Sequence, residues 1–206
     1  IKALSREYLI VNIFINDWRE TSRVKGVQLI SEPMSGPSIY HNTSTSLGKI
    51  QNLLSGYRDT TKVIVLIGEE GTGKLAAART LHQLSVHHDK PYYLIDCFRF
   101  LPDAIQLDTN QFDTMESTGT SIIFNNFQEA SPAVKKQILG YIEQLQSKKG
   151  SRFYLTVCSS QSESGSQIDL KDILEQISRS LPCLTIEMPP LRERKEDLPY
   201  LITLYL

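Results

Sequence analysis

The stretch Val63-Ile64-Val65-Leu66-Ile67-Gly68-Glu69-Glu70-Gly71-Thr72-Gly73-Lys74 decides the fold of this chain. Its apolar half has the length and composition of a buried strand, and its second half is a glycine-rich turn that ends on a lysine. Glycines expose successive backbone N–H groups, and a helix N-terminus beside a lysine attracts oxyanions. The spacing G-x-x-x-x-G-K from Gly68 to Lys74 therefore predicts a phosphate-binding loop between a strand and a helix.

The segments on either side of this stretch alternate between strand and helix patterns. Helical spacing of apolar residues predicts helices at 47–54, 73–84, 132–145 and 173–180, and another that begins near Asp197. Apolar runs of strand length lie at 92–95, 121–124, 152–157 and 184–188. This alternation predicts an α/β fold in three layers, with a parallel sheet between two layers of helices.

Residues 1–37 have a different character. The sequence predicts a strand from Tyr8 to Ile15, a turn at Asn16-Asp17 and a helix from Trp18 to Ile30, and the Pro- and Ser-rich stretch 31–37 has linker composition. So small a piece cannot fold alone, so it is either the remnant of a preceding regulatory domain or packs on its neighbour. We place the domain boundary so that residues 1–37 precede an α/β unit of residues 38–206.

Composition excludes several classes of function. A formal net charge of -1 over 206 residues gives the segment no strong attraction to nucleic acid. The 3 cysteines have no paired spacing, which favours neither a disulfide framework nor a zinc site. No apolar run reaches the length of a membrane span. We therefore expect a cytoplasmic chain with no metal site and no membrane contact, and the lack of an initiator Met indicates a fragment.

Several motifs give the chain a resemblance to a known family. Behind Val65 to Lys74 come Ala78-Arg79 and Leu81-His82, and later Lys90-Pro91-Tyr92-Tyr93, Gly119 to Phe124, Ala130-Ser131-Pro132 and Ile186 to Arg194 followed by Glu196 to Pro199. Over residues 38–206 the chain resembles the AAA+ central domain of bacterial enhancer-binding proteins, the activators of sigma-54 RNA polymerase. The resemblance implies the α/β subdomain of a P-loop NTPase, truncated before its helical lid.

The chain departs from this family where ATP is split. At the end of the third strand the family has an Asp-Glu pair, the Asp for magnesium and the Glu for the attacking water, and here those positions are Asn125 and Asn126. An amide is a weaker magnesium ligand than a carboxylate and cannot act as a general base. The residue after Lys74, usually Ser or Thr, is Leu75, and the sensor position falls at Ser160. We expect hydrolysis to be very slow and magnesium binding to be weak or absent.

Contacts with other subunits also look altered. The family's two arginines that reach a neighbouring nucleotide are replaced by Leu174 and Ser180, with Arg179 one residue away, a position more typical of a solvated helix charge. The Gly-Ala-Phe-Thr-Gly-Ala tip that touches sigma-54 does not occur between Cys97 and Gly119. Self-association through AAA+ faces and contact with RNA polymerase or other regulators are what the resemblance implies, as is DNA binding by a C-terminal helix-turn-helix outside the fragment.

The expected ligand is ATP, ADP or a signalling nucleotide such as cyclic di-GMP. The predicted binding residues are Gly68, Glu69, Glu70, Gly71, Thr72, Gly73, Lys74, Leu75 and Arg79. Arg192 and Arg194 are expected to be structural, paired with Glu193, Glu196 or Asp197. Asp96, which would end the edge strand in the family, away from the loop, is not expected to replace the missing acids. Two alternatives stay open, an active ATPase with non-standard residues and a scaffold that binds no nucleotide.

Overall fold

The structure, a computed structural model, describes residues 27–30, 45–90, 92–97, 121–146, 150–159 and 169–205. Several expectations lie outside these residues: the strand at 8–15, the turn at 16–17, the linker at 31–37, the stretch 98–120 without a sigma-contacting tip, and the sensor residue Ser160. The division of the chain at residue 37 likewise stays a prediction.

A central sheet carries the described fold. Its strands are β1 (Val27–Ile30), β2 (Val63–Gly68), β3 (Tyr92–Asp96), β4 (Ser121–Asn125), β5 (Arg152–Cys158) and β6 (Cys183–Glu187). They are ordered β1-β3-β4-β5-β2-β6. The five strands from β3 to β6 run parallel, and β1 alone is antiparallel to its neighbour β3.

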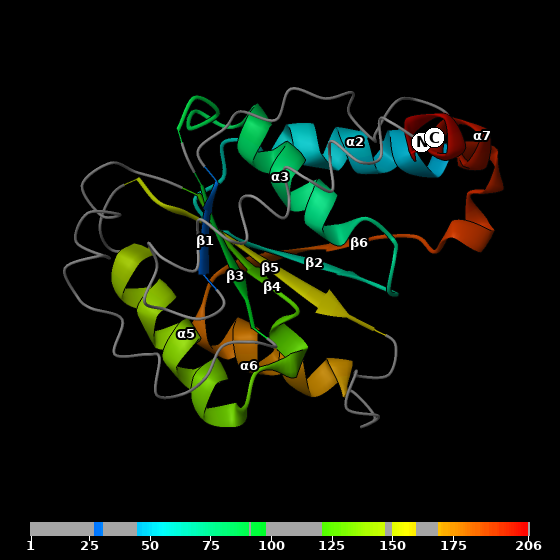
Figure 1. The fold of residues 1–206 in the computed structure, drawn as a ribbon. Coiled ribbons are helices and arrows are strands. Elements are labelled where there is room, and N and C mark those ends of the chain that lie inside the picture. The colour runs from blue at the N-terminus through cyan, green and yellow to red at the C-terminus, as the bar shows by residue number, and fades with distance from the viewer. Residues whose placement is uncertain are drawn as a thin grey trace.

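Helices cover both faces of this sheet, as Figure 1 shows. One face carries α2 (Thr45–Tyr57) and α3 (Lys74–Leu84), and the other carries α5 (Pro132–Gln146) and α6 (Leu170–Ser180). Short 3-10 turns at 127–129, 191–193 and 195–197 complete the described chain, and α7 (Leu198–Tyr205) follows the last of them. The predicted three-layer α/β fold is confirmed, and so is each of its predicted helices and strands from residue 47 onward.

The apolar residues separate into two cores, one on each face. Ala77, Ala78 and Leu81 of α3, predicted to face inward, are fully buried against β2 and β5 residues in the first core. The stripe predicted on α5, which includes Ile138 and Ile142, is buried in the second core with residues of α6. With β2 buried at all of its positions, the sheet holds the start of the glycine loop in a fixed place.

The helix predicted from Trp18 to Ile30 is wrong over residues 27–30, which form β1. These residues pair with β3 in the register Val27 to Ile95 through Ile30 to Tyr92. A free strand edge exposes unpaired backbone groups, and pairing removes them, so tertiary pairing prevails over the local helical pattern. The pairing agrees with the alternative that this N-terminal piece packs on its neighbour. It also means that β3 is not the edge strand of the described sheet, contrary to expectation.

Candidate functional site

The glycine loop lies where the sequence predicted it, between β2 and α3. This is the carboxyl end of the parallel strands, where open α/β sheets bind ligands. Gly71 and Gly73 have φ values of 73° and 88°, a conformation that residues with a Cβ rarely adopt. Because α3 begins at Lys74, the N–H groups of its first turn have no partner within the helix. The backbone is therefore arranged to bind an oxyanion.

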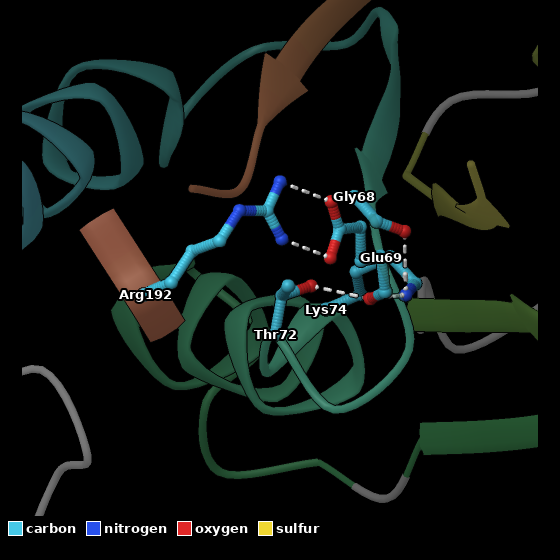
Figure 2. Close-up of polar contacts among 5 residues, drawn as sticks. All are labelled: Gly68, Glu69, Thr72, Lys74 and Arg192. Atoms are coloured by element: carbon cyan, nitrogen blue, oxygen red, sulfur yellow. Dashed lines mark hydrogen bonds and ion pairs between the residues drawn. The ribbon is translucent and has the colours of Figure 1, made fainter. Parts of the chain in front are cut away.

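Lys74 lies inside the loop, with 8% of its surface exposed. Figure 2 shows its Nζ donating to two loop carbonyl oxygens, that of Gly68 at 2.9 Å and that of Glu69 at 2.6 Å. Burial lowers the pKa of Lys74, and nearby Cys158 and Glu70 oppose that shift. A buried ammonium is costly unless it is paired, and a phosphate bound at the loop would pair with it.

Neighbouring backbone fixes the start of the loop. The Gly68 carbonyl also accepts a hydrogen bond from the Ser159 N–H, at 3.0 Å, and the Ile67 carbonyl accepts one from Met188 N–H, at 2.7 Å. A Cβ at Gly68 would lie 2.8 Å from the Met188 carbonyl oxygen and 2.8 Å from Thr72 Oγ1. Only glycine fits this close approach.

Residues 188–197, here called the return segment, lead from β6 to α7 and contact the loop through two arginines. Arg192 donates two hydrogen bonds of 2.7 Å to the Glu69 carboxylate, Nη1 to Oε2 and Nη2 to Oε1 (Figure 2). Those bonds lower the pKa of Glu69 below its usual value. Arg194 is buried and donates from Nη2 to the Thr72 carbonyl oxygen at 2.8 Å.

Of the ion pairs expected for these two arginines, the one of Arg194 is confirmed and the one of Arg192 is wrong. Arg194 does pair with Asp197, at 4.0 Å, and Asp197 is fully buried. Arg192 pairs with Glu69, 123 residues away, and not with a neighbour in its own segment. The local charge pattern favoured acidic partners close in sequence, because it contains no information about which distant segment the fold brings near Arg192.

A pocket of about 510 Å³ opens beside the loop. Its wall comes from α2, from the first residues of the loop, from the ends of β5 and β6, and from the return segment: Ser46, Lys49, Ile50, Leu53, Gly68, Glu69, Ser159, Glu187, Met188, Pro189, Pro190, Arg192 and Glu193. This volume is within the range that small-molecule sites occupy. The sequence did not predict the pocket residues of α2 and of the return segment. They are distinguished only by their place beside the loop, which the fold determines and no sequence motif marks.

Asn125 ends β4 and Asn126 follows it, and β5 lies between β4 and β2, the strand that leads into the loop. Thr156 of β5 holds both: its Oγ1 donates to Asn125 Oδ1 at 2.7 Å and accepts from the Asn126 N–H at 3.0 Å. Asn126 has φ of 56°, and among the described residues it is the one non-glycine with a positive φ. Asparagine tolerates this left-handed conformation better than most residues, so the residue suits its backbone.

Replacing Thr156 with valine removes this bridge while keeping the shape of the side chain. Thr156 is fully buried, so the side-chain amide oxygen Oδ1 of Asn125 and the backbone N–H of Asn126 would lose their partner. We expect a loss of about 1 to 3 kcal/mol in unfolding free energy, measured by urea denaturation. Thr156→Ser, which keeps the hydroxyl, is expected to lose only about 1 kcal/mol for the missing methyl. A valine variant as stable as the native chain would contradict the bridging role.

Other predicted site residues lie elsewhere. Arg79 stands against Tyr92, at the amino end of β3, where its charge opposes the rise that burial causes in the pKa of Tyr92. It does not line the pocket beside the loop. Arg179 forms an exposed ion pair with Glu175, 2.5 Å apart, one turn away on α6, which agrees with a solvated helix charge.

Asp96, expected to lie away from the loop, ends β3, which β4 and β5 separate from β2. It is the direct partner of Asn125 in the parallel register of β3 and β4. Partners in a parallel pair point to the same face of the sheet, so the two side chains are neighbours. Among the described residues no group of three His, Cys, Asp or Glu side chains is placed to hold a metal ion. Likewise, no described helix is both long enough and apolar enough to span a bilayer.

Comparison with known proteins shows which proteins this chain is similar to. The chain is 21% identical over 228 aligned residues to the transcriptional regulatory protein ZraR of Salmonella typhi, covering 98% of this chain and 52% of ZraR. It is 24% identical over 163 residues to the Nif-specific regulatory protein of Herbaspirillum seropedicae, covering 69% of this chain and 30% of that protein. The chain thus spans about half, or less, of the curated relatives it matches.

Solved structures agree on the fold. NtrX from Brucella abortus in complex with ADP superposes with a TM-score of 0.61 at 16% identity, over 98% of this chain and 45% of NtrX. NtrX in complex with ATP gives a TM-score of 0.56 over 78% of this chain and 39% of NtrX. A family model, described as the sigma-54 interaction domain, matches residues 42–191. Because that match covers well over half of this chain, the chain belongs to the sigma-54 interaction domain family and has the α/β fold of AAA+ P-loop NTPases.

Proposed function

We propose that this chain is the nucleotide-binding module of a bacterial transcriptional regulator, and that it binds ATP or ADP with little or no hydrolysis. One contrast carries the proposal: the phosphate loop keeps its glycines and a buried Lys74, while β4 ends on Asn125 and is followed by Asn126, where carboxylates would be needed for hydrolysis. The solved complexes of NtrX with ATP and ADP, which share this fold, support nucleotide binding.

The residues of the loop fit a polyphosphate. Gly71 and Gly73 present the backbone, α3 contributes its N-terminus, and Lys74 contributes a buried positive charge. The pocket of about 510 Å³ between α2 and the return segment offers room for a ribose and base. A larger ligand such as cyclic di-GMP is the less favoured candidate because its phosphodiesters carry fewer charges for the loop.

Residues that would hold magnesium and activate water do not fit that task. Magnesium, when bound, neutralises phosphate charge, but Asn125 and Asn126 offer it only neutral amide oxygens. Neither amide can accept the proton of an attacking water. Leu75 has no hydroxyl for the ion. Loss of a general base alone costs about 10²- to 10⁴-fold in rate, so turnover is expected to be very slow.

Calorimetric titration of the chain with ATP, ADP and cyclic di-GMP tests the binding half of this proposal. Binding of ATP or ADP with one site per chain is the expected result. No heat and no thermal stabilisation with any of the three would favour the scaffold alternative and overturn the proposal.

The alternative of an active ATPase has one observation in its favour, the place of Asp96 beside Asn125. A carboxylate there could act in place of the missing acids. That alternative requires magnesium-dependent phosphate release which Asp96→Asn abolishes and Asn125→Ala reduces. Absence of phosphate release from the native chain removes it.

Restoring the Asp-Glu pair at positions 125 and 126 tests whether the loss of these two acids alone explains the expected lack of hydrolysis. Asn125→Asp with Asn126→Glu is expected to raise phosphate release from background to a low but measurable rate, because one magnesium ligand and one base return. Recovery is expected to be partial because glutamate at a φ of 56° is strained. That strain is expected to lower the unfolding free energy by about 1 kcal/mol. Asn125→Asp alone, the control, is expected to stay at background; equal release from all three proteins would contradict the assignment.

The regulatory setting follows from the family. Occupancy of the loop is proposed to change assembly or domain packing without turnover, since a ligand shifts an equilibrium by its differential affinity for two states. Self-association through AAA+ faces, contact with RNA polymerase or other regulators, DNA binding through a C-terminal helix-turn-helix and a cytoplasmic location complete the proposal.

A further inference from the structure

We propose that Arg192 is a phosphate-binding residue that exchanges partners: it leaves the Glu69 carboxylate and binds the phosphates of a nucleotide on the loop. The inference rests on the nucleotide binding proposed above. It adds a residue from outside the glycine loop and a gating role for the first glutamate of the loop.

Geometry supplies the first argument. Arg192 and Glu69 both line the pocket beside Gly68, and Figure 2 shows the guanidinium facing the loop from the return segment. Its two 2.7 Å bonds use the planar fork that also fits phosphate oxygens. The groups that would hold a phosphate, Lys74 and the N-terminus of α3, belong to the loop that carries Glu69.

Charge supplies the second argument. A polyphosphate on the loop would place several negative charges near the Glu69 carboxylate and repel it. The same charges would attract Arg192, which carries the cation nearest to that carboxylate. Glu69 and the nucleotide thus compete for one guanidinium, and the anion with the greater charge is expected to win.

Exposure makes the exchange feasible. The side chains of Arg192 and Glu69 are 62% and 42% exposed, and exposed ion pairs are weak enough for a ligand to open. Arg194, in contrast, is 5% exposed and bound to the Thr72 carbonyl. It anchors the return segment to the loop while Arg192 moves, so the released guanidinium stays within reach of a bound phosphate.

Two variants of the pair have expected effects of opposite sign on ATP affinity, measured by calorimetric titration of the whole chain. Glu69→Gln frees Arg192 and removes a repelling charge, and is expected to tighten ATP binding about two- to fivefold. Arg192→Gln removes a phosphate contact and leaves the repelling carboxylate, and is expected to weaken ATP binding about tenfold or more. Arg192→Lys, with charge but no fork, is expected to fall between the native chain and Arg192→Gln.

Arg179→Gln is the matched control, because it breaks another exposed ion pair, on α6 away from the loop; it is expected to leave ATP affinity unchanged. Thermal unfolding without nucleotide verifies that each variant is folded. If both Glu69→Gln and Arg192→Gln weaken ATP binding, or neither changes it, while the native chain binds ATP, the exchange of partners is wrong and the proposed function stands. If the native chain binds neither ATP nor ADP, both proposals fall.

Discussion

Replacing Lys74 with alanine is expected to lower the affinity for ATP by about 10- to 100-fold. Lys74 is the one cation inside the loop among the residues that the structure describes, and its ammonium is bound to the Gly68 and Glu69 carbonyl oxygens. Removing it takes away the charge that a phosphate would pair with, while the loop backbone stays. Calorimetric titration with ATP measures the change directly.

The alanine variant is expected to remain folded. The Gly68 carbonyl keeps the Ser159 N–H as a partner, and the Glu69 carbonyl keeps the Thr72 hydroxyl at 2.8 Å. Neither of these two carbonyl oxygens is therefore left without a hydrogen bond. Lys171→Ala, at an exposed position of α6, is the control and is expected to bind ATP as the native chain does. Native affinity in Lys74→Ala would mean that the nucleotide does not bind at this loop.

Replacing Gly68 with alanine is expected to lower the unfolding free energy by about 3 kcal/mol and to distort the loop. The added Cβ would lie 2.8 Å from the Met188 carbonyl oxygen, closer than real Cβ atoms approach. Met188 cannot retreat easily because its N–H is bound to the Ile67 carbonyl in the sheet. Urea denaturation measures the loss, and ATP titration is expected to show weaker binding as well.

Gly140→Ala is the matched control for this variant. A Cβ at Gly140 meets nothing within 4 Å, and the position lies inside α5. Alanine is favoured over glycine within a helix, so we expect stabilisation by about 0.5 to 1 kcal/mol. If Gly68→Ala and Gly140→Ala had the same effect, close packing at the loop would not be the reason for glycine at position 68.

Local patterns were enough to predict most of the fold. The strand β2 and the helix α3 follow from an apolar run, a glycine turn and helical spacing, because both elements bury a face that the sequence marks directly. The same holds for α5, whose apolar stripe is buried as predicted. The loop could be placed for the same reason: a short, contiguous motif determines its position.

Features that depend on distant pairing could not be predicted. Residues 27–30 became β1 because β3 offered them an edge, and no local pattern records that edge. Arg192 met Glu69 because the sheet order places β6 next to β2. Thr156 looked like an ordinary strand residue, and its bridge to both asparagines depends on β5 lying beside β4. Sequence motifs thus located the loop but not the residues that the fold brings to it.

The most direct test of the account is to incubate the chain with ATP and magnesium, isolate the protein-bound nucleotide and identify it by chromatography. The account predicts that bound nucleotide remains ATP over hours, because Asn125 and Asn126 supply no base. Steady accumulation of ADP that Lys74→Ala abolishes would contradict it.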